Sequence, residues 1–240
     1  MERLDKIIST GGGISRSDAR KAVLKGRVSV NGKTVRDIAF KVDPTADLVV
    51  LDDNKICYKK YIYLIMNKPE GVLTATEDKR QKTVLDLIPK ELYRKDLFPV
   101  GRLDKNTTGL LIITNDGDFG HTLLSPNQKV PKKYFVTLDG EVGDDLPQKF
   151  AAGLTLADGT KLAPADIKIL NPKSTALVTI TEGKYHQIKR MFGLFDLGVN
   201  ALERVSFAGL DLPKDLLYGQ VRELTNCEHD IIKNAKKTLK

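Results

Sequence analysis

The sequence is poor in the residues that build metal centres. Its 240 residues include two cysteines, three histidines and no tryptophan. Cys57 and Cys227 lie far apart and match no metal-ligand spacing, and the histidines are scattered without cysteines or carboxylates at such a spacing. We therefore expect no bound metal and a reducing compartment, which favours a cytosolic protein.

Long apolar runs are also missing. The longest, YIYLIM at 61–66 and GLLIIT at 109–114, have the length of a strand and fall well short of the roughly 18 residues that span a bilayer. The first ten residues, MERLDKIIST, carry charges through the first turn and lack the apolar stretch of a signal peptide. We expect no contact with a membrane.

The composition is otherwise that of a globular protein with a basic excess. Hydrophobic residues make up 41% and charged residues 29%, and the length suits a medium domain with a small one, or two of similar size. The net charge is +8, and residues 1–36 hold nine Lys or Arg against three Asp or Glu. Such a local excess is typical of a surface that binds nucleic acid, with a solvated helix face as the alternative. Aromatic residues make up only 6%, so no stacking platform for single strands is indicated.

The basic segment predicts a small unit of two helices and a hairpin. A first helix over 3–10 ends at three glycines, and Ser15 is placed to cap a second helix that runs to Gly26. Asn31–Gly32 then predicts a type I′ turn between two short strands. Residues 52–60 are polar and charged, which indicates a linker.

RLDK followed by SRSDARKAVLKGRVSVNGKTV resembles the αL RNA-binding domain first seen in a small-subunit ribosomal protein. The resemblance covers residues 1–58 and implies that the second helix and the hairpin edge contact RNA. An unrelated basic helix and hairpin is the alternative. The RNA-binding residues it implies are Arg16, Arg20, Lys21, Lys25, Arg27 and Asn31.

Beyond the linker the pattern changes to short strands with helices between them. Strands are expected near 61–68, 110–116, 133–140 and 176–183, and helices near 83–92, 145–154 and 186–195. Because the two types do not alternate strictly, the class is α+β, with a mixed, mostly antiparallel sheet over 61–232. Residues 233–240 are a basic tail.

One polar turn stands out as a candidate for chemistry. The chain has no Walker loop, no dinucleotide-binding glycine motif and no nucleophile elbow. Asp104 lies in GRLDKNTTGLLIITNDG, residues 101–117, between an apolar stretch and a strand, with Arg102 close enough in sequence to hold its charge. A lone carboxylate in a turn is usually structural, so the local pattern leaves both roles open.

The same string resembles the motif that holds the catalytic aspartate of pseudouridine synthases, the RsuA group in particular. NKPEG, 67–71, is similar to the family's first motif, a turn that supports the aspartate loop. KKYFVTL is similar to the motif of the active-site tyrosine, here Tyr134, and EGKYHQIKRMF to the motif of a basic partner for the aspartate, here Lys189. VRELT aligns Leu224 with a leucine of the pocket wall.

Alternatives remain at two of these positions. Tyr134 shares strand parity with two apolar residues, so a core role also explains it locally. Arg190 is the rival of Lys189 for the basic role. The sequence also departs from the family at Lys105 and Asn106, where an acidic residue is common after the aspartate, and this departure changes the charge of the loop.

The resemblance implies isomerisation of a specific uridine in 16S ribosomal RNA, with no cofactor, by a monomer that acts on 16S rRNA or a pre-30S particle. The target base must be flipped into a pocket, where a carboxylate either attacks covalently or removes a proton at C-2′. A 23S rRNA target is the alternative. A non-catalytic assembly factor is a further one, and a glycosidase is weaker because no second carboxylate is linked to Asp104.

Overall fold

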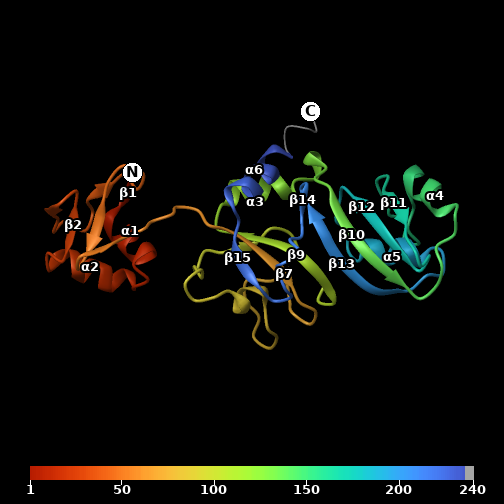
Figure 1. Cartoon of the computed structure of the whole chain (residues 1–240), viewed down its shortest axis with the longest axis horizontal. Coiled ribbons are helices and arrows are strands. Elements are labelled where there is room, and N and C mark those ends of the chain that lie inside the picture. The colour runs from red at the N-terminus through yellow and green to blue at the C-terminus, as the bar shows by residue number, and fades with distance from the viewer. Residues whose placement is uncertain (236–240) are drawn as a thin grey trace. The chain divides into compact units, whose positions relative to one another are not determined.

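The computed structural model describes residues 1–235, which form two compact units, Met1–Ile62 and the chain from Tyr63 onward (Figure 1). Residues 236–240, the greater part of the expected basic tail, lie outside the described residues. In the described part, no helix combines the length and apolar character needed to cross a membrane.

The first unit packs two helices against short strands. Its α1 and α2 supply Leu4, Ile8 and Val23 to a core that Val28 and Val49 complete from the strands. A two-stranded sheet joins β1 and β4, and a four-stranded sheet has the order β3-β2-β5-β6. The elements are α1 (Leu4–Gly11), α2 (Arg16–Leu24), β1 (Glu2–Arg3), β2 (Val28–Val30), β3 (Lys33–Thr34), β4 (Lys41–Val42), β5 (Val49–Leu51) and β6 (Asn54–Lys55).

The caps and the hairpin expected here are confirmed. The Ser15 hydroxyl accepts the Asp18 backbone N–H at 3.1 Å, and Asn31 and Gly32 both have positive φ, 51° and 78°, as a type I′ turn requires. The linker prediction over 52–60 is wrong at its start. Asp52 and Asp53, both with positive φ, form a tight turn, and Asn54–Lys55 then pairs with β5 as a strand.

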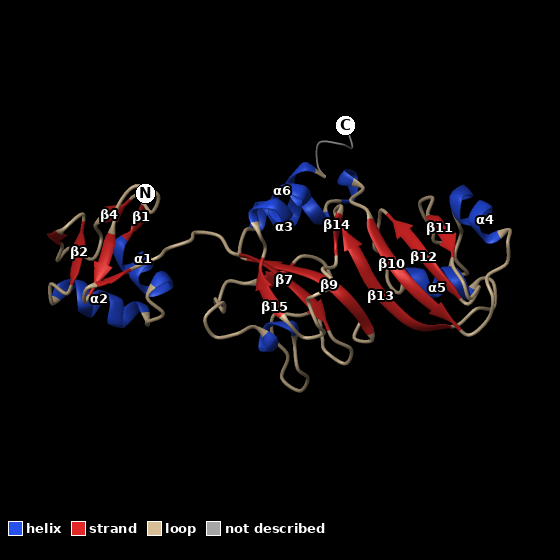
Figure 2. Ribbon diagram, viewed as in Figure 1, coloured by secondary structure: helices blue, strands red, loops and turns tan. Residues whose placement is uncertain are grey.

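The second unit is built on a nine-stranded sheet (Figure 2). The main path runs β11-β12-β10-β13-β9-β7-β15, with β14 beside β13 and β8 beside β9. The β9–β13 pair is parallel and the other pairs are antiparallel, so the α+β prediction is confirmed. The strands are β7 (Tyr63–Lys68), β8 (Phe98–Pro99), β9 (Thr107–Thr114), β10 (Lys132–Leu138), β11 (Asp166–Ile169), β12 (Thr175–Ile180), β13 (Val199–Phe207), β14 (Leu210–Asp211) and β15 (Val221–Glu223).

Helices α3 and α6 lie together near β14, and α4 and α5 lie near β11 and β12 (Figure 1). The helices expected near 145–154 and 186–195 are present. The helix expected over 83–92 is wrong in extent: only one 3-10 turn forms before Ile88 becomes extended ahead of Pro89. The helices are α3 (Gly117–Leu124), α4 (Leu146–Ala152), α5 (Gln187–Gly193) and α6 (Asn226–Asn234), with 3-10 turns η1 (Val84–Leu87) and η2 (Pro126–Gln128).

Candidate active site

Asp104 lies in the loop between β8 and β9, and buried contacts fix that loop on both sides. Leu103 is 6% exposed, and its backbone N–H and C=O both bond the buried Thr74 hydroxyl, at 3.2 and 2.8 Å. The Gly71 N–H donates to the Lys105 carbonyl at 2.9 Å, and the Thr107 N–H to the Asp104 carbonyl at 3.0 Å. The Asp104 carboxylate is therefore held through its backbone, while its side chain keeps 34% exposure.

Lys68 holds the same loop through hydrogen bonds to its backbone carbonyls. Its side chain is fully buried, and its ammonium donates to the carbonyls of Asp104 and Lys105 at 3.1 Å and of Thr107 at 2.9 Å. Burial lowers the pKa of Lys68 to about 8, against the opposing attraction of Asp104 and Glu70. Sequence reasoning assigned NKPEG to support of the aspartate loop without singling out this lysine; a charged residue at the end of an apolar strand was the available signal.

A pocket opens at the Asp104 side chain and brings four of the five expected active-site residues together. Loop, strand β10 and helix α5 all contribute to its wall. Leu224 is not part of this wall. It follows β15 and packs against the core cluster that contains Ile65 and Phe119. The predicted residues that line the pocket are Arg102, Asp104, Tyr134 and Lys189.

Tyr134 faces the pocket from β10 and is 7% exposed, so its strand parity places it in the core and at the site at once. Across β13 its register partner is Arg204, which is 2% exposed and donates from Nε to the Leu110 carbonyl at 2.7 Å. Burial lowers the pKa of Arg204, partly offset by Tyr134. The sequence analysis missed Arg204. This residue alternates with buried neighbours along β13, a pattern that indicates only a residue on the inner face of a strand.

The close approach of β13 to β9 explains Gly109 in the aspartate motif. A Cβ at this position would lie 2.4 Å from the Arg204 carbonyl oxygen, and its φ of +100° disfavours any side chain. Thr107, two residues earlier, is buried in the pocket wall, and its hydroxyl has no hydrogen-bond partner among the described residues. The parallel pairing thus brings the Asp104 loop against the strand that carries Arg204.

The two basic candidates on helix α5, Lys189 and Arg190, have different surroundings. Lys189 lines the pocket, whereas Arg190 points to Asp158, with Nη2 2.5 Å from Oδ2. Within residues 1–235, the structure shows no ion pair between Lys189 and Asp104. His186 instead contacts the aspartate, with Nε2 3.6 Å from Oδ1. The sequence analysis gave His186 no role at the site, although this residue stands in the EGKYHQIKRMF string.

Arg102 is exposed at the pocket wall. Among the described residues no group of three or more His, Cys, Asp and Glu side chains is arranged to hold a metal ion.

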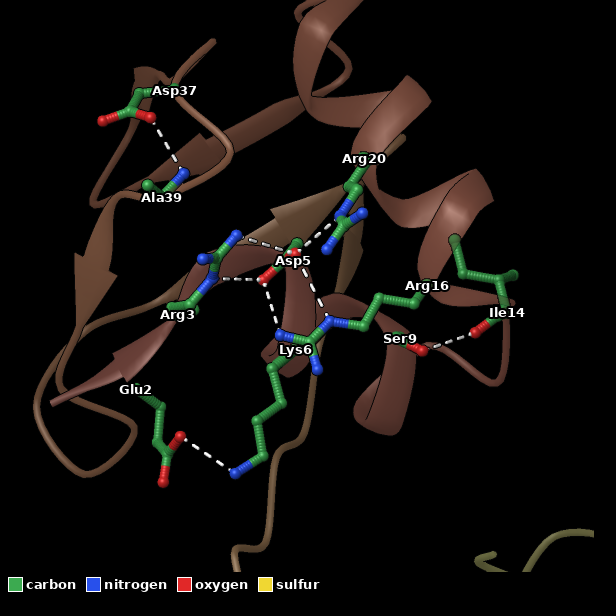
Figure 3. Close-up of polar contacts among 10 residues, drawn as sticks. All are labelled: Glu2, Arg3, Asp5, Lys6, Ser9, Ile14, Arg16, Arg20, Asp37 and Ala39. Atoms are coloured by element: carbon green, nitrogen blue, oxygen red, sulfur yellow. Dashed lines mark hydrogen bonds and ion pairs between the residues drawn. The ribbon is translucent and has the colours of Figure 1, made fainter.

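In the first unit, a buried carboxylate gathers three arginines (Figure 3). Asp5 is fully buried and accepts side-chain hydrogen bonds from Arg3, Arg16 and Arg20, with N···O distances between 3.0 and 3.3 Å. Burial alone would raise the pKa of Asp5, but the three guanidinium groups outweigh it and hold the pKa well below its usual range. The arginine side chains remain about half exposed, so their outer N–H groups face solvent.

The other expected RNA-binding residues differ in how strongly the fold already engages them. Arg27 pairs with Asp52, and Asn31 bonds both Asp47 and the Leu48 backbone. Lys21 lies 3.6 Å from Asp18 on the exposed face of α2. Lys25, also exposed, has no ion pair among the described residues.

Comparison with known proteins agrees with this architecture. Residues 62–193 match the RNA pseudouridylate synthase family and residues 2–48 match the S4 domain. The chain is 42% identical to YtzG of Bacillus subtilis, described as an uncharacterized RNA pseudouridine synthase, covering 94% of this chain and 96% of that one. It is 39% identical to the ribosomal small subunit pseudouridine synthase A of Escherichia coli K12, covering 94% and 97%. A crystal structure of a pseudouridylate synthase superposes with a TM-score of 0.68 at 31% identity, covering 97% and 100%.

Fold, pocket and sequence together define an RNA-modifying isomerase with an added RNA-binding unit. The chain belongs to the RNA pseudouridine synthase family, as a member of its RsuA type.

Proposed function

We propose that this enzyme converts one uridine of 16S ribosomal RNA to pseudouridine, at a site of the uridine-516 type. The observation that carries the proposal is the pocket that gathers Asp104, Tyr134 and Lys189. Similarity to the small-subunit synthase of Escherichia coli over nearly the whole chain favours 16S over 23S rRNA.

In this proposal the target uridine is flipped into the pocket against Asp104. The carboxylate either attacks covalently or takes the C-2′ proton, and its one-third exposure leaves it reachable by the base and sugar. Tyr134 stacks on the uracil and assists loss of the C-5 proton, and Lys189 supplies a positive charge to the pocket wall beside the carboxylate. Arg102, exposed at the wall, contacts the RNA backbone. We do not assign Leu224 to this pocket.

We propose residues 1–58 as the RNA-binding domain and 61–232 as the catalytic domain. The enzyme acts as a cytoplasmic monomer on 16S rRNA or a pre-30S particle, where its substrate is made. It requires no cofactor, because the isomerisation breaks and re-forms bonds within one nucleotide without net oxidation.

Tritium release tests the target. Purified enzyme is incubated with 16S and 23S transcripts and with pre-30S particles, each labelled with tritium at C-5 of uridine. Release from 16S transcripts or pre-30S particles, equal to one uridine per molecule, is the expected result. Release confined to 23S RNA would move the enzyme to the large-subunit branch.

Lys189→Met is expected to lower the single-turnover rate of tritium release by about 10- to 100-fold. The reason is that the carboxylate, once RNA covers the pocket, loses the cation that lines the pocket wall with it. The measurement is single-turnover tritium release at saturating RNA.

Arg190→Met is the matched control on the next residue of α5, because Arg190 pairs with Asp158 outside the pocket. It should leave the single-turnover rate near that of the wild type. Exchange of the two phenotypes would make Arg190 the partner of Asp104.

Replacing Lys21 and Lys25 by Ala is expected to weaken RNA binding and to reduce the slope of log K against log salt by about 0.7 to 0.9 for each lost phosphate contact. The thermal midpoint should stay within about a degree or two, since surface substitutions change stability little. The measurement is filter binding over a salt series.

Arg16→Ala is the contrasting variant: it also removes a partner of the buried Asp5, so it should lower stability as well as affinity. An unchanged salt slope in the double lysine variant would make that face an ordinary solvated surface.

A further inference from the structure

The turn that leads from β12 into α5 holds two aromatic side chains at its tip. The Gln187 N–H donates to the Lys184 carbonyl at 3.1 Å, which closes a four-residue turn with Tyr185 and His186 at its centre. The Gln187 side chain accepts the Lys184 N–H at 2.9 Å and closes the turn a second time. The two rings therefore project from a turn with little freedom to move.

The base of this turn is tied to neighbouring segments. Gln187 is 4% exposed and donates from its side chain to Glu182 at 3.0 Å. The same Glu182 oxygen accepts the Ala163 N–H at 3.0 Å, and the Lys184 ammonium donates to the Lys161 carbonyl at 2.5 Å. A surface held in this way before it binds has less conformational entropy to lose on binding.

The two rings are stacked on each other beside the catalytic carboxylate. Their centroids are 3.9 Å apart, with 16° between the planes. His186 has a left-handed backbone, φ 46°, which is unusual for a residue other than glycine, and it lines the pocket. Its Nε2 is 3.6 Å from the Asp104 carboxylate, so the order of groups outward from the site is Asp104, His186, Tyr185.

Tyr185 is displayed rather than buried. It is 75% exposed, whereas the pocket tyrosine, Tyr134, is 7% exposed. A large ring left in water gains free energy by stacking on another flat ring, and every nucleobase offers such a face. The adjoining exposed cation of the pocket wall, Arg102, suits a phosphate beside that base.

We propose that the Tyr185–His186 pair is a stacking platform that takes a nucleobase next to the target uridine. The inference rests on the RNA substrate proposed above. The uridine occupies the pocket of Asp104 and Tyr134, and a neighbouring base lies on the outer face of Tyr185. The platform holds the strand beside the flipped nucleotide, and it selects flat bases without reading their edges. The low aromatic content of the sequence did not predict this platform. A single exposed tyrosine in a rigid turn is enough to form it.

Tyr185→Ala is expected to lower kcat/KM for tritium release by about 5- to 150-fold, the range that the loss of one base–aromatic stack corresponds to. The substrate is a synthetic RNA that spans the modified uridine and that the wild-type enzyme turns over. Tyr185→Trp should retain activity within about threefold, because stacking needs a flat ring and not the hydroxyl. Tyr93→Ala, at a 48% exposed tyrosine of the same unit outside the pocket wall, should match the wild type.

A double-substitution cycle separates stacking from support of His186. The RNA is prepared with an abasic nucleotide on the 5′ side or the 3′ side of the target. On one of these two RNAs the loss caused by Tyr185→Ala should shrink to about twofold or less, because the base that it contacts is already gone. An equal loss on both abasic RNAs and on the intact RNA would contradict the stacking proposal. Tyr185 would then act only by positioning His186. Failure of the wild-type enzyme on rRNA would instead contradict the proposed target, so the two failures are distinct.

Discussion

Asp104→Asn is expected to abolish pseudouridine formation, with a loss of about 10⁴-fold or more, while the protein stays folded and binds RNA with nearly unchanged affinity. Either chemical route requires the negative charge of the carboxylate, and the amide is a poor nucleophile and a poor base. The loop itself should persist, because Lys68 and the Thr107 N–H bind the backbone carbonyl of Asp104 and not its side chain. Tritium release, thermal unfolding and filter binding measure the three properties.

Asp118→Asn is a suitable control, since this carboxylate is exposed in the first turn of α3 in the same unit and lies outside the pocket wall. It should leave all three properties unchanged. Residual turnover of a few per cent in Asp104→Asn would mean that another group carries the chemistry.

Lys68→Met is expected to have the second largest effect, a loss in kcat of about 100-fold or more, with RNA affinity near that of the wild type. The substitution removes the ammonium from three carbonyls of the aspartate loop, two of which keep only a backbone N–H donor, and a displacement of about 1 Å at the reacting group costs on the order of 100-fold. Stability should also fall, by about 1–3 kcal/mol for the loss of this buried donor. Single-turnover kinetics and denaturant unfolding give the two quantities.

Lys132→Met provides the matched control. Lys132 is another lysine whose pKa burial lowers to about 8, but it bonds a carbonyl of its own segment, that of Val130 at 2.9 Å, and it does not line the pocket. Its replacement should affect stability far more than kcat. If Lys68→Met behaves in the same way, Lys68 supports the fold without positioning the aspartate.

The lowered pKa of Lys68 also gives a signed pH dependence. Between about pH 8 and 10.5 the folded protein binds fewer protons at this residue than the unfolded chain does. The free energy of unfolding of the wild type, taken relative to Lys68→Met, should therefore rise as the pH increases through this window. A flat difference across it would show that Lys68 is not buried in a charge-disfavouring site.

Motifs with local backbone signals could be predicted from the sequence. The Ser15 cap, the Asn31–Gly32 turn and the β7 and β9 strands depend on neighbours in the chain, and the structure confirms them. The site residues Asp104, Tyr134 and Lys189 were predicted from their resemblance to family motifs. The structure brings these three into one pocket. Their catalytic roles stay predictions.

Contacts between segments distant in sequence could not be predicted. Lys68 reaches carbonyls 36 to 39 residues away, and Arg204 reaches one 94 residues away. Asp5 was counted only as one acidic residue in a basic segment, although it organises three arginines. Each of these depends on tertiary packing that places a charged group in the interior beside its partners, and no local spacing encodes it.

A pseudouridine map of rRNA tests the central claim most directly. Cells that lack the gene are complemented with the wild-type enzyme or with Asp104→Asn at equal protein levels, and pseudouridine is mapped at single-nucleotide resolution in 16S and 23S rRNA. One 16S position should lose its pseudouridine in the deletion, regain it with the wild type and stay unmodified with Asp104→Asn. Restoration of that position by Asp104→Asn, or a 16S map that does not change on deletion, would contradict this account.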